Sequence, residues 1–488
     1  MKKTPVFRCL TLTLAALGAS AASEAASLLE VYQQALQSDP LIHEAEARRL
    51  AALETKPQAR GFLLPQIDAS GSWQSGTQDG SSLEVDTTGA VAVLPFGLDY
   101  ETKQWQLGLR QTIFRWDQFI GMKQADKIVA RADVVYEAAQ QDLMVRVVQR
   151  YFDVLAAEDR LTSIHADRQA IARQLEQARQ RFEVGLIAIT DVQESQAAYD
   201  QAVAAEIAAQ RDLATARELL RELTGERVPQ LAAPGEDFPL PTPNPADIDA
   251  WVDLAMDQNL NLLAARFDER IARDEISFRR SGHYPTIDLV ASRGSSDTTG
   301  DASRGTGPLF PADELRNDEF IGVEVTIPLF SGGRVSSQVR EAVYLHRAEM
   351  EVLQRTARET ERATRDAYLG VLSEISRVNA LEQAVRSGRT ALEATQAGFD
   401  VGTRTIVDVL NSQRALYQAI TNFYQSRYDY VLNVLRLKAA AGTLKVQDLE
   451  QIDHALAARK PPEQVIAEDE AKSGQEQQQQ RQEPEQEP

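Results

Sequence analysis

The stretch Phe182-Glu-Val-Gly-Leu-Ile-Ala-Ile-Thr-Asp-Val192 decides how this chain folds, because the chain contains it twice. The second copy, Phe399-Asp-Val-Gly-Thr-Arg-Thr-Ile-Val-Asp-Val409, lies 217 residues further along. Between residues 182–202 and 399–419 the copies are identical at 11 of 21 positions, where chance would give about one or two. The sequence therefore predicts an internal duplication.

A coiled-coil pattern leads into both copies. Seam positions recur at alternating steps of three and four residues, and the second seam repeats the first after 217 residues. These positions are Leu161, Ile164, Arg168, Ile171, Leu175, Ala178 and Phe182, and then Val378, Leu381, Val385, Gly388, Leu392, Thr395 and Phe399. Each seam ends near a glycine suited to a left-handed helix C-cap, followed by a short connector and another helix. The pattern predicts one helical hairpin in each half.

The first 25 residues have the features of a secretory signal peptide. Three basic residues precede an apolar run, and small residues with possible cleavage sites follow it. The only cysteine, Cys9, lies in this segment, so the rest of the chain offers no thiol or disulfide chemistry. The segment carries three basic and one acidic side chain, so its removal changes the net charge from −20 to −22. This acidic balance argues against a nucleic-acid partner, because phosphate binding needs a basic surface.

The two halves, residues 26–227 and 246–445, have the same predicted order of elements: a helix, a pair of strands, a 66-residue helix, the turn and a shorter helix. Helices are expected at 27–60, 117–182 and 191–224, then at 246–278, 334–399 and 408–441. Alternation predicts strands at 67–73, 105–113, 287–291 and 321–327. Polar loops rich in Gly, Ser and Asp are expected between paired strands, the second spanning about 294–317.

Three further segments are distinguished by composition or position. Six prolines predict a semi-rigid linker between the halves at 228–245. Residues 446–460 are expected to form an equatorial, C-terminal segment. The Gln-, Glu- and Pro-rich residues 461–488 predict a disordered tail.

The four strands have a pattern typical of a sheet in contact with lipid. Trp73, Trp105, Ile113, Leu289 and Val323 are expected on the outward face, and aromatic residues gather near the strand ends at Phe62, Phe96, Tyr100, Phe114, Trp116, Tyr284, Phe320 and Phe330. No apolar run of 18 residues follows the signal peptide, so no transmembrane helix is expected. Because four strands are too few for a barrel with a lumen, they are expected to close with strands of other protomers.

The helix lengths predict the remainder of the architecture. A 66-residue helix extends for roughly 100 Å, and the two shorter helices of each half, about 33 and 34 residues, together match that length. The fold class is therefore expected to be an α+β membrane protein with an internal duplication. A long α-helical cylinder would be continuous with a β-barrel, and both turns would lie at the far tip.

At residues 28–450 the chain resembles the TolC family of outer-membrane channel-tunnel proteins. The resemblance rests on Leu29-Glu-Val-Tyr-Gln-Gln-Ala35, Leu64-Pro-Gln-Ile67, Phe330-Ser-Gly-Gly-Arg-Val335, Val401-Gly-Thr-Arg-Thr-Ile-Val-Asp-Val-Leu410 and Ala441-Gly-Thr-Leu444. It implies a homotrimer with a 12-stranded barrel in outer-membrane lipid and a helical tunnel in the periplasm. It also implies a periplasmic membrane-fusion adaptor and an inner-membrane ABC or proton-driven exporter as partners, for type I protein secretion, efflux of toxic compounds, or both.

The resemblance assigns roles to residues at the tips. Asp408 matches the family's aperture aspartate, whereas Asn411 stands where a second aspartate is usual, which puts strong cation selectivity in doubt. Arg404 would pair with Thr190 and Asp191 in a closed-state latch, and Phe399 replaces a tyrosine whose hydroxyl often contributes, so one tie fewer is expected. The segments Val184-Gly185-Leu186 and Val401-Gly402-Thr403 would receive the adaptor. Simpler roles are open to the same residues: an N-terminal helix cap for Asp408, a solvated Arg404, and plain C-caps for the glycines.

The function expected from the resemblance is that of a trimeric exit duct gated by iris-like opening of its tip. Other functional classes have less support from the sequence. Five scattered histidines and no phosphate-binding glycine loop leave no catalytic constellation, metal site or cofactor motif. The main alternative is an extracytoplasmic structural or adhesive coiled-coil protein without a pore. A second is a periplasmic adaptor, but adaptors normally carry a lipoyl-like domain in a single hairpin, whereas this chain has two hairpins.

Overall fold

The computed structural model describes residues 26–85, 89–235, 239–304 and 308–457. The signal peptide expected at 1–25 and the tail expected at 461–488 lie outside these residues, as do residues 458–460 of the C-terminal segment. Within the described ranges, none of the helices combines the length and the apolar character needed to cross a membrane.

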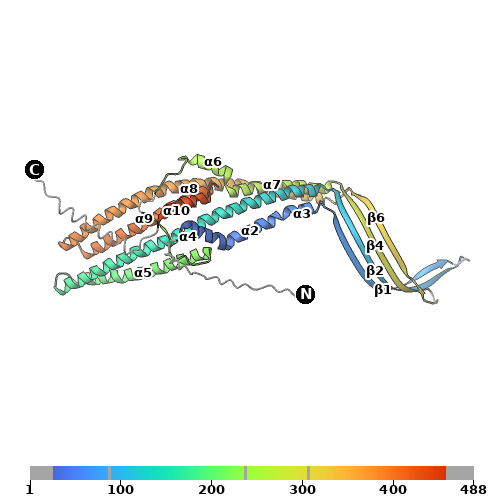
Figure 1. Ribbon diagram of the computed structural model, residues 1–488, viewed down its shortest axis with the longest axis horizontal. Coiled ribbons are helices and arrows are strands. Elements are labelled where there is room, and N and C mark those ends of the chain that lie inside the picture. The colour runs from blue at the N-terminus through green and yellow to red at the C-terminus, as the bar shows by residue number, and fades with distance from the viewer. Residues whose placement is uncertain (1–25, 86–88, 236–238, 305–307, 458–488) are drawn as a thin grey trace, which may run out of the picture.

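Two very long helices run the length of the helical body (Figure 1). Helix α4, Trp116–Glu183, has 68 residues and α8, Arg334–Asp400, has 67, close to the 66 expected for each. Helix α5, Ile189–Thr224, returns along α4, and α9, Ile406–Ala440, returns along α8. The two helical hairpins expected from the repeated turns are therefore present, with their tips at the end farthest from the sheet (Figure 1).

The helices expected at 27–60 and 246–278 are each interrupted, which corrects the prediction of single helices. The first is divided into α1, Leu28–Ser38, α2, Pro40–Leu53, and α3, Thr55–Gly61; the second is divided into α6, Ile248–Gln258, and α7, Leu260–Arg280. Asp39 and Asn259 adopt extended ψ angles, 118° and 123°, and their side chains accept hydrogen bonds from the next helix. Asx residues offer the backbone this alternative, and at Asp39 the following proline also disfavours helical geometry.

Four long antiparallel strands form a curled sheet at the opposite end of the molecule (Figure 1). They are β1, Gln66–Val85, β2, Val91–Phe114, β4, Thr286–Arg304, and β6, Glu314–Thr326. The order is β1-β2-β4-β6, so β2 and β4 join the strand pairs of the two halves, and the two-residue β5, Phe310–Pro311, extends beside β4. The four strands expected from the alternation are confirmed.

The strands are much longer than expected, because most of the polar segments predicted as loops belong to them. β1 and β2 pair from Gln66 with Arg110 up to Val85 with Val91, and β4 continues to Arg304. Asp and Gly, which are frequent in these segments, have low strand preference. They are held in the sheet here by ladder hydrogen bonds to neighbours, which local composition does not reveal.

One face of the sheet is apolar and exposed. Ile67, Trp73, Trp105, Ile321 and Val323 are all more than half exposed, and strand alternation places them on the same face. The opposite face carries Arg110 with Asp288 and Glu324, at 3.1 and 3.4 Å. Alternation also places three of the expected girdle aromatics, Phe96, Tyr100 and Phe320, on this polar face rather than on the apolar one, which corrects part of that prediction.

The main hydrophobic core lies midway along the helical body, where α1 and α10, Val446–His454, pack against the long helices (Figure 1). Leu28, Val147, Tyr151, Leu435 and Leu449 are fully or almost fully buried there. The linker crosses this level, with β3, Ala233–Pro234, paired to β7, Leu456–Ala457. The 3₁₀ turn η1, Ser281–His283, connects α7 to the sheet. The hairpin tips extend well beyond this core and rest on much smaller clusters.

Candidate functional site at the tips of the two helical hairpins

The two repeated turns have the same backbone. Gly185 and Gly402 adopt φ angles of +77° and +78°, the left-handed region that glycine occupies without strain. In the first turn the Leu186 N–H donates to the Arg181 carbonyl at 2.8 Å, and in the second the Thr403 N–H donates to the Gly398 carbonyl at 2.8 Å. In both turns the N–H of one residue donates to the carbonyl five residues earlier, which is the hydrogen bond of the Schellman motif at a helix C-terminus. The glycines are thus C-caps, as the simpler interpretation expects.

The residues assigned to adaptor docking lie at the surface of these turns. Val184, Leu186 and Val401 are 70%, 73% and 75% exposed, although each is apolar. A Cβ placed on either tip glycine meets no atom within 4 Å, so the backbone of both turns is open to an approaching chain. The expected docking surface, Val184, Gly185, Leu186, Val401, Gly402 and Thr403, is therefore apolar and accessible in the protomer.

Asp408 lies in the first turn of α9 and closes a capping box with Thr405. Its carboxylate accepts bonds from the Thr405 N–H and hydroxyl, both at 3.0 Å, while its own N–H donates to the Thr405 oxygen at 3.3 Å. These bonds, with a smaller contribution from Arg404, hold the pKa of Asp408 below its ordinary value of 3.8. Asn411 is exposed one turn further along.

The sign of this pKa shift sets the pH range in which the cap acts. A carboxylate whose pKa is lower in the folded than in the unfolded protein stabilises the fold above the unfolded pKa. That contribution disappears as the pH falls through the lower, folded-state pKa. Asp408 is therefore ionised near neutral pH.

Within one protomer, the described residues show no hydrogen bond or ion pair from the Arg404 side chain to Thr190 or Asp191. Arg404 is exposed, and its Cγ lies over Gly398, where an added Cβ would be 2.7 Å away. Thr190 and Asp191 lie in the first turn of α5, where Asp191 accepts the Ser195 hydroxyl at its backbone carbonyl. The latch between these residues remains a prediction about the assembled protein.

The structure does connect the two tips, through Phe399 and two residues that the sequence analysis did not single out, Arg181 and Asp400. The Arg181 guanidinium is 2.9 Å from the Asp400 carboxylate and 4.8 Å from the centre of the Phe399 ring. Phe399, expected to leave the latch with one tie fewer for lack of a hydroxyl, contacts Arg181 through its ring face. The sequence contained one indication of this contact. The duplication aligns Arg181 with Gly398, so the arginine is present in only one of the two copies.

A second polar connection lies further from the tips. Gln413, which is 2% exposed, donates to the Asp167 carbonyl and carboxylate at 3.2 and 2.6 Å and accepts from Gln174 at 3.0 Å. Burial raises the pKa of Asp167, and the bond from Gln413 counteracts the rise. The matching residue of the first copy, Gln196, instead bonds within its own hairpin to Arg179. The identical residues of the repeat therefore have different partners, and the sequence alone does not distinguish them.

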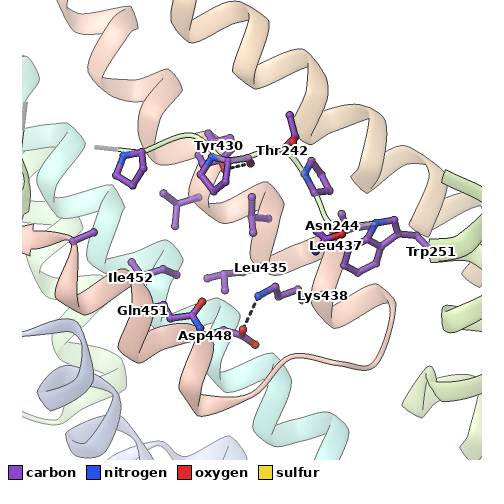
Figure 2. Close-up of a pocket in the computed structure, with 16 residues that line it drawn as sticks. Thr242, Asn244, Trp251, Tyr430, Leu435, Leu437, Lys438, Asp448, Gln451 and Ile452 are labelled. Atoms are coloured by element: carbon purple, nitrogen blue, oxygen red, sulfur yellow. Dashed lines mark hydrogen bonds and ion pairs between the residues drawn. The ribbon is translucent and has the colours of Figure 1, made fainter. Parts of the chain in front are cut away.

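A cavity of about 390 Å³ lies at the core level between the linker and helices α9 and α10 (Figure 2). Its walls are mainly apolar, and Tyr430 and Trp251 donate to the carbonyls of Pro241 and Pro245 at 2.6 and 2.8 Å. Lys438 is neutralised by Asp448 at 2.6 Å (Figure 2). Burial raises the pKa of Tyr430 to about 12, so its hydroxyl stays a donor near neutral pH. These contacts attach the linker to α9 and α6.

No cluster of three or more potential metal-binding side chains occurs in the part of the chain that the structure describes. The distinctive chemistry of the described tips is therefore one of caps, ion pairs and exposed apolar turns.

Comparisons with known proteins agree with this geometry. The family model for "Outer membrane efflux protein" matches residues 31–226 and 251–443. The chain is 38% identical over 447 residues to outer membrane protein TolC of Vibrio cholerae, covering 91% of this chain and 98% of that protein. It is 38% identical to TolC of Escherichia coli, with 90% and 87% covered. It is also 29% identical to the alkaline protease secretion protein AprF of Pseudomonas aeruginosa, with 88% and 87% covered.

Solved structures show the same fold. The outer membrane protein VceC of Vibrio cholerae superposes with a TM-score of 0.67 at 20% identity, covering 85% of this chain and 96% of that one. CusC gives 0.68 at 17% identity, with 85% and 92% covered. The chain therefore belongs to the outer membrane efflux protein family as a TolC-type channel of the bacterial outer membrane, a passive conduit for efflux or secretion whose helical tunnel lies in the periplasm.

Proposed function

We propose that three copies of this chain form an exit duct that opens and closes at its periplasmic tip. The observation that carries the trimer is the state of the sheet edges: among the described strands β1 pairs only with β2, and β6 only with β4 and thus with no second neighbour. Open strand edges are not stable in lipid. Three sheets of four long strands, joined edge to edge, would close a 12-stranded barrel whose apolar face meets the lipid.

The duct would work with a periplasmic membrane-fusion adaptor and an inner-membrane ABC or proton-driven exporter. The turns at Val184–Leu186 and Val401–Thr403 support adaptor docking, because their glycines are exposed and let a partner backbone approach closely. The names of relatives such as the alkaline protease secretion protein AprF support secreted proteins as cargo. Membership of an efflux family supports small toxic compounds. Both cargo classes fit a passive conduit driven by its partners.

The gate is assigned to the tips, with Asp408 forming a ring of three carboxylates at the aperture and Arg404 pairing with Thr190 and Asp191 of a neighbouring hairpin. The exposed Arg404 side chain and the ionised Asp408 support these roles. Asn411, adjacent on α9, leaves the ring with one carboxylate per protomer.

Replacing Arg404 with serine is expected to increase single-channel conductance in planar bilayers and to lengthen the open periods, because it removes the proposed tie between hairpins. Arg386→Ser is a matched control, since the Arg386 ion pair with Glu382 stays within one turn of α8. Wild-type currents indistinguishable from those of Arg404→Ser would refute this latch. Folded, membrane-inserted protein that conducts no ions would refute the pore and favour the structural coiled-coil alternative.

The Asp408 ring is expected to produce a modest preference for cations, measured as the reversal potential across a KCl gradient. Asp408→Asn should abolish this preference, and Asn411→Asp should increase it by supplying a second carboxylate per protomer. The bonds from Thr405 hold the pKa of Asp408 below its ordinary value, so the wild-type preference should be present at neutral pH and disappear only under acidic conditions. A reversal potential that is the same in wild type and Asp408→Asn would exclude Asp408 from the aperture.

A further inference from the structure

Arg181 contacts the other hairpin at two points. It lies in the last turn of α4, and its guanidinium faces both the Asp400 carboxylate at 2.9 Å and the Phe399 ring at 4.8 Å from the ring centre. Asp400 and Phe399 are the last residues of α8, so one side chain spans from the end of one hairpin to the end of the other. A guanidinium can pair with a carboxylate and stack on an aromatic face at the same time, which an ammonium does less well.

The surroundings of Phe399 keep this contact in place. Phe399 packs against a small apolar cluster that draws on both hairpins: Ile171, Ala198, Ala202, Ile406 and Leu410. Phe399 is thus held by the cluster, and the Arg181 guanidinium lies over the face of its ring. Two thirds of the Arg181 side chain is buried, whereas Asp400 is 52% exposed. The Phe399 ring therefore restricts the Arg181 side chain. Because the side chain is already restricted, forming the ion pair with Asp400 costs less side-chain entropy than forming a fully exposed pair.

The duplication shows that this contact belongs to one copy only. The position matching Arg181 in the second turn is Gly398, and the space a side chain would need there is taken by Arg404. Two turns with the same backbone thus carry one arginine each at different positions. Arg181 points to the protomer's own second hairpin, whereas Arg404 remains exposed in the protomer.

The two connections between hairpins differ in depth. The Gln413 connection to Asp167 and Gln174 is buried and lies further from the tips, about two turns after the start of α9 and about four turns, at Asp167, before the end of α4. Arg181 lies next to the turn itself and is partly exposed. Local separation of the two turns therefore requires loss of the Arg181 contacts, while the Gln413 connection and the apolar cluster around Ile171 and Leu410 still join the hairpins further from the tips.

We propose that Arg181 is the positioning residue that holds the two hairpin tips of each protomer together in the closed gate, by gripping Phe399 and Asp400 at once. This inference rests on the gate described under the proposed function and adds an intra-protomer latch to it. Arg181 sets the position of the α8–α9 tip, and hence of Asp408, without lining the aperture itself.

The distance between the tips measures this latch directly. Val184 and Val401 are exposed, and the only native cysteine, Cys9, lies in the predicted signal peptide, so cysteines introduced at these two positions can be spin-labelled selectively. Labelled protein diluted with excess unlabelled protein gives the tip-to-tip distance within one protomer by double electron–electron resonance. Arg181→Ala is expected to raise the population of separated tips by roughly tenfold, as loss of one ion pair and one cation–π contact predicts.

A matched control and a charge swap make the test specific. Arg179→Ala should leave the distances unchanged, because Arg179 bonds to Gln196 inside its own hairpin at 2.6 Å. Arg181→Glu should separate the tips further than Arg181→Ala, and adding Asp400→Arg should bring them together again. Asp400→Asn serves as the second variant if Arg181→Ala lowers the helix content measured by circular dichroism.

Unchanged distances in Arg181→Ala, or an equal change in Arg179→Ala, would overturn the proposal. Failure of the proposal and failure of the proposed function remain distinct, because the distance measurement needs no ion flow. If the protein conducts ions but the tip-to-tip distance is the same in Arg181→Ala as in the wild type, only the latch is refuted. A protein without conductance refutes the channel function, whatever the tip distances are.

Discussion

Replacing Gly442 with alanine is expected to destabilise the protein by about 3 kcal/mol or more. Gly442 follows the C-cap of α9 with φ at +73°, and an added Cβ would lie 2.1 Å from the Gln258 carbonyl oxygen and 3.0 Å from the Asn259 nitrogen. These are backbone atoms at the junction of α6 and α7, which cannot move aside like the end of a flexible side chain. Thermal unfolding of the purified protein in detergent, followed by circular dichroism, measures the loss.

Gly402→Ala is the matched control for this variant. Gly402 occupies the same position after α8, with φ at +78°, but a Cβ there meets no atom within 4 Å. Its substitution should cost only the left-handed backbone strain, roughly 1–2 kcal/mol. If both variants lowered the unfolding temperature equally, the close approach of the α6–α7 junction to α9 would not matter for stability.

Replacing Tyr151 with alanine is expected to reduce the free energy of unfolding by roughly 3–5 kcal/mol, the range for removing a large buried side chain. Tyr151 is fully buried in the main core and lies edge-on to Phe152, with ring centres 5.8 Å apart. Its hydroxyl is 2.7 Å from the Ala232 carbonyl oxygen and 3.2 Å from that of Ala26. The side chain thus ties the linker and the start of the described chain to α4.

Tyr151→Phe separates the packing contribution from the hydrogen bond. Burial raises the pKa of Tyr151, so the native hydroxyl is a neutral donor at all ordinary pH values. Phenylalanine keeps the ring and leaves the Ala232 carbonyl without this donor, which should cost about 1–2 kcal/mol. Equal losses for the two variants in chemical denaturation would mean that the bond to the linker, rather than packing, dominates at this site.

Much of the architecture follows from local sequence. The long helices were predictable because their three- and four-residue seam repeats over many turns, and the turns because glycine alone enters the left-handed region freely. Gly185 and Gly402 have the expected backbone to within a degree of one another in φ. The core of each strand was also predictable, because side chains alternate between the two faces of a sheet.

Other features depend on partners distant in the sequence. The outer parts of β1 and β4 are rich in Gly, Ser and Asp, which are not typical strand formers, yet they pair because neighbouring strands supply the hydrogen bonds. The break at Asn259 is also tertiary, since its side chain donates to the Ala440 carbonyl at 2.8 Å while capping α7. The helix or strand preferences of a short stretch of sequence cannot indicate either contact.

The candidate site shows the same division most clearly. The sequence by itself determined that the chain is duplicated, that each half ends in a glycine-capped helical turn, and that Thr405 and Asp408 can cap α9, because all of these depend on residues within one or two turns of each other. Only the tertiary structure decided that Arg181 meets Phe399 and Asp400, and that Gln413 is buried between hairpins while Gln196 is not. Those contacts join residues more than 200 positions apart, and they depend on how two nearly identical hairpins lie against each other.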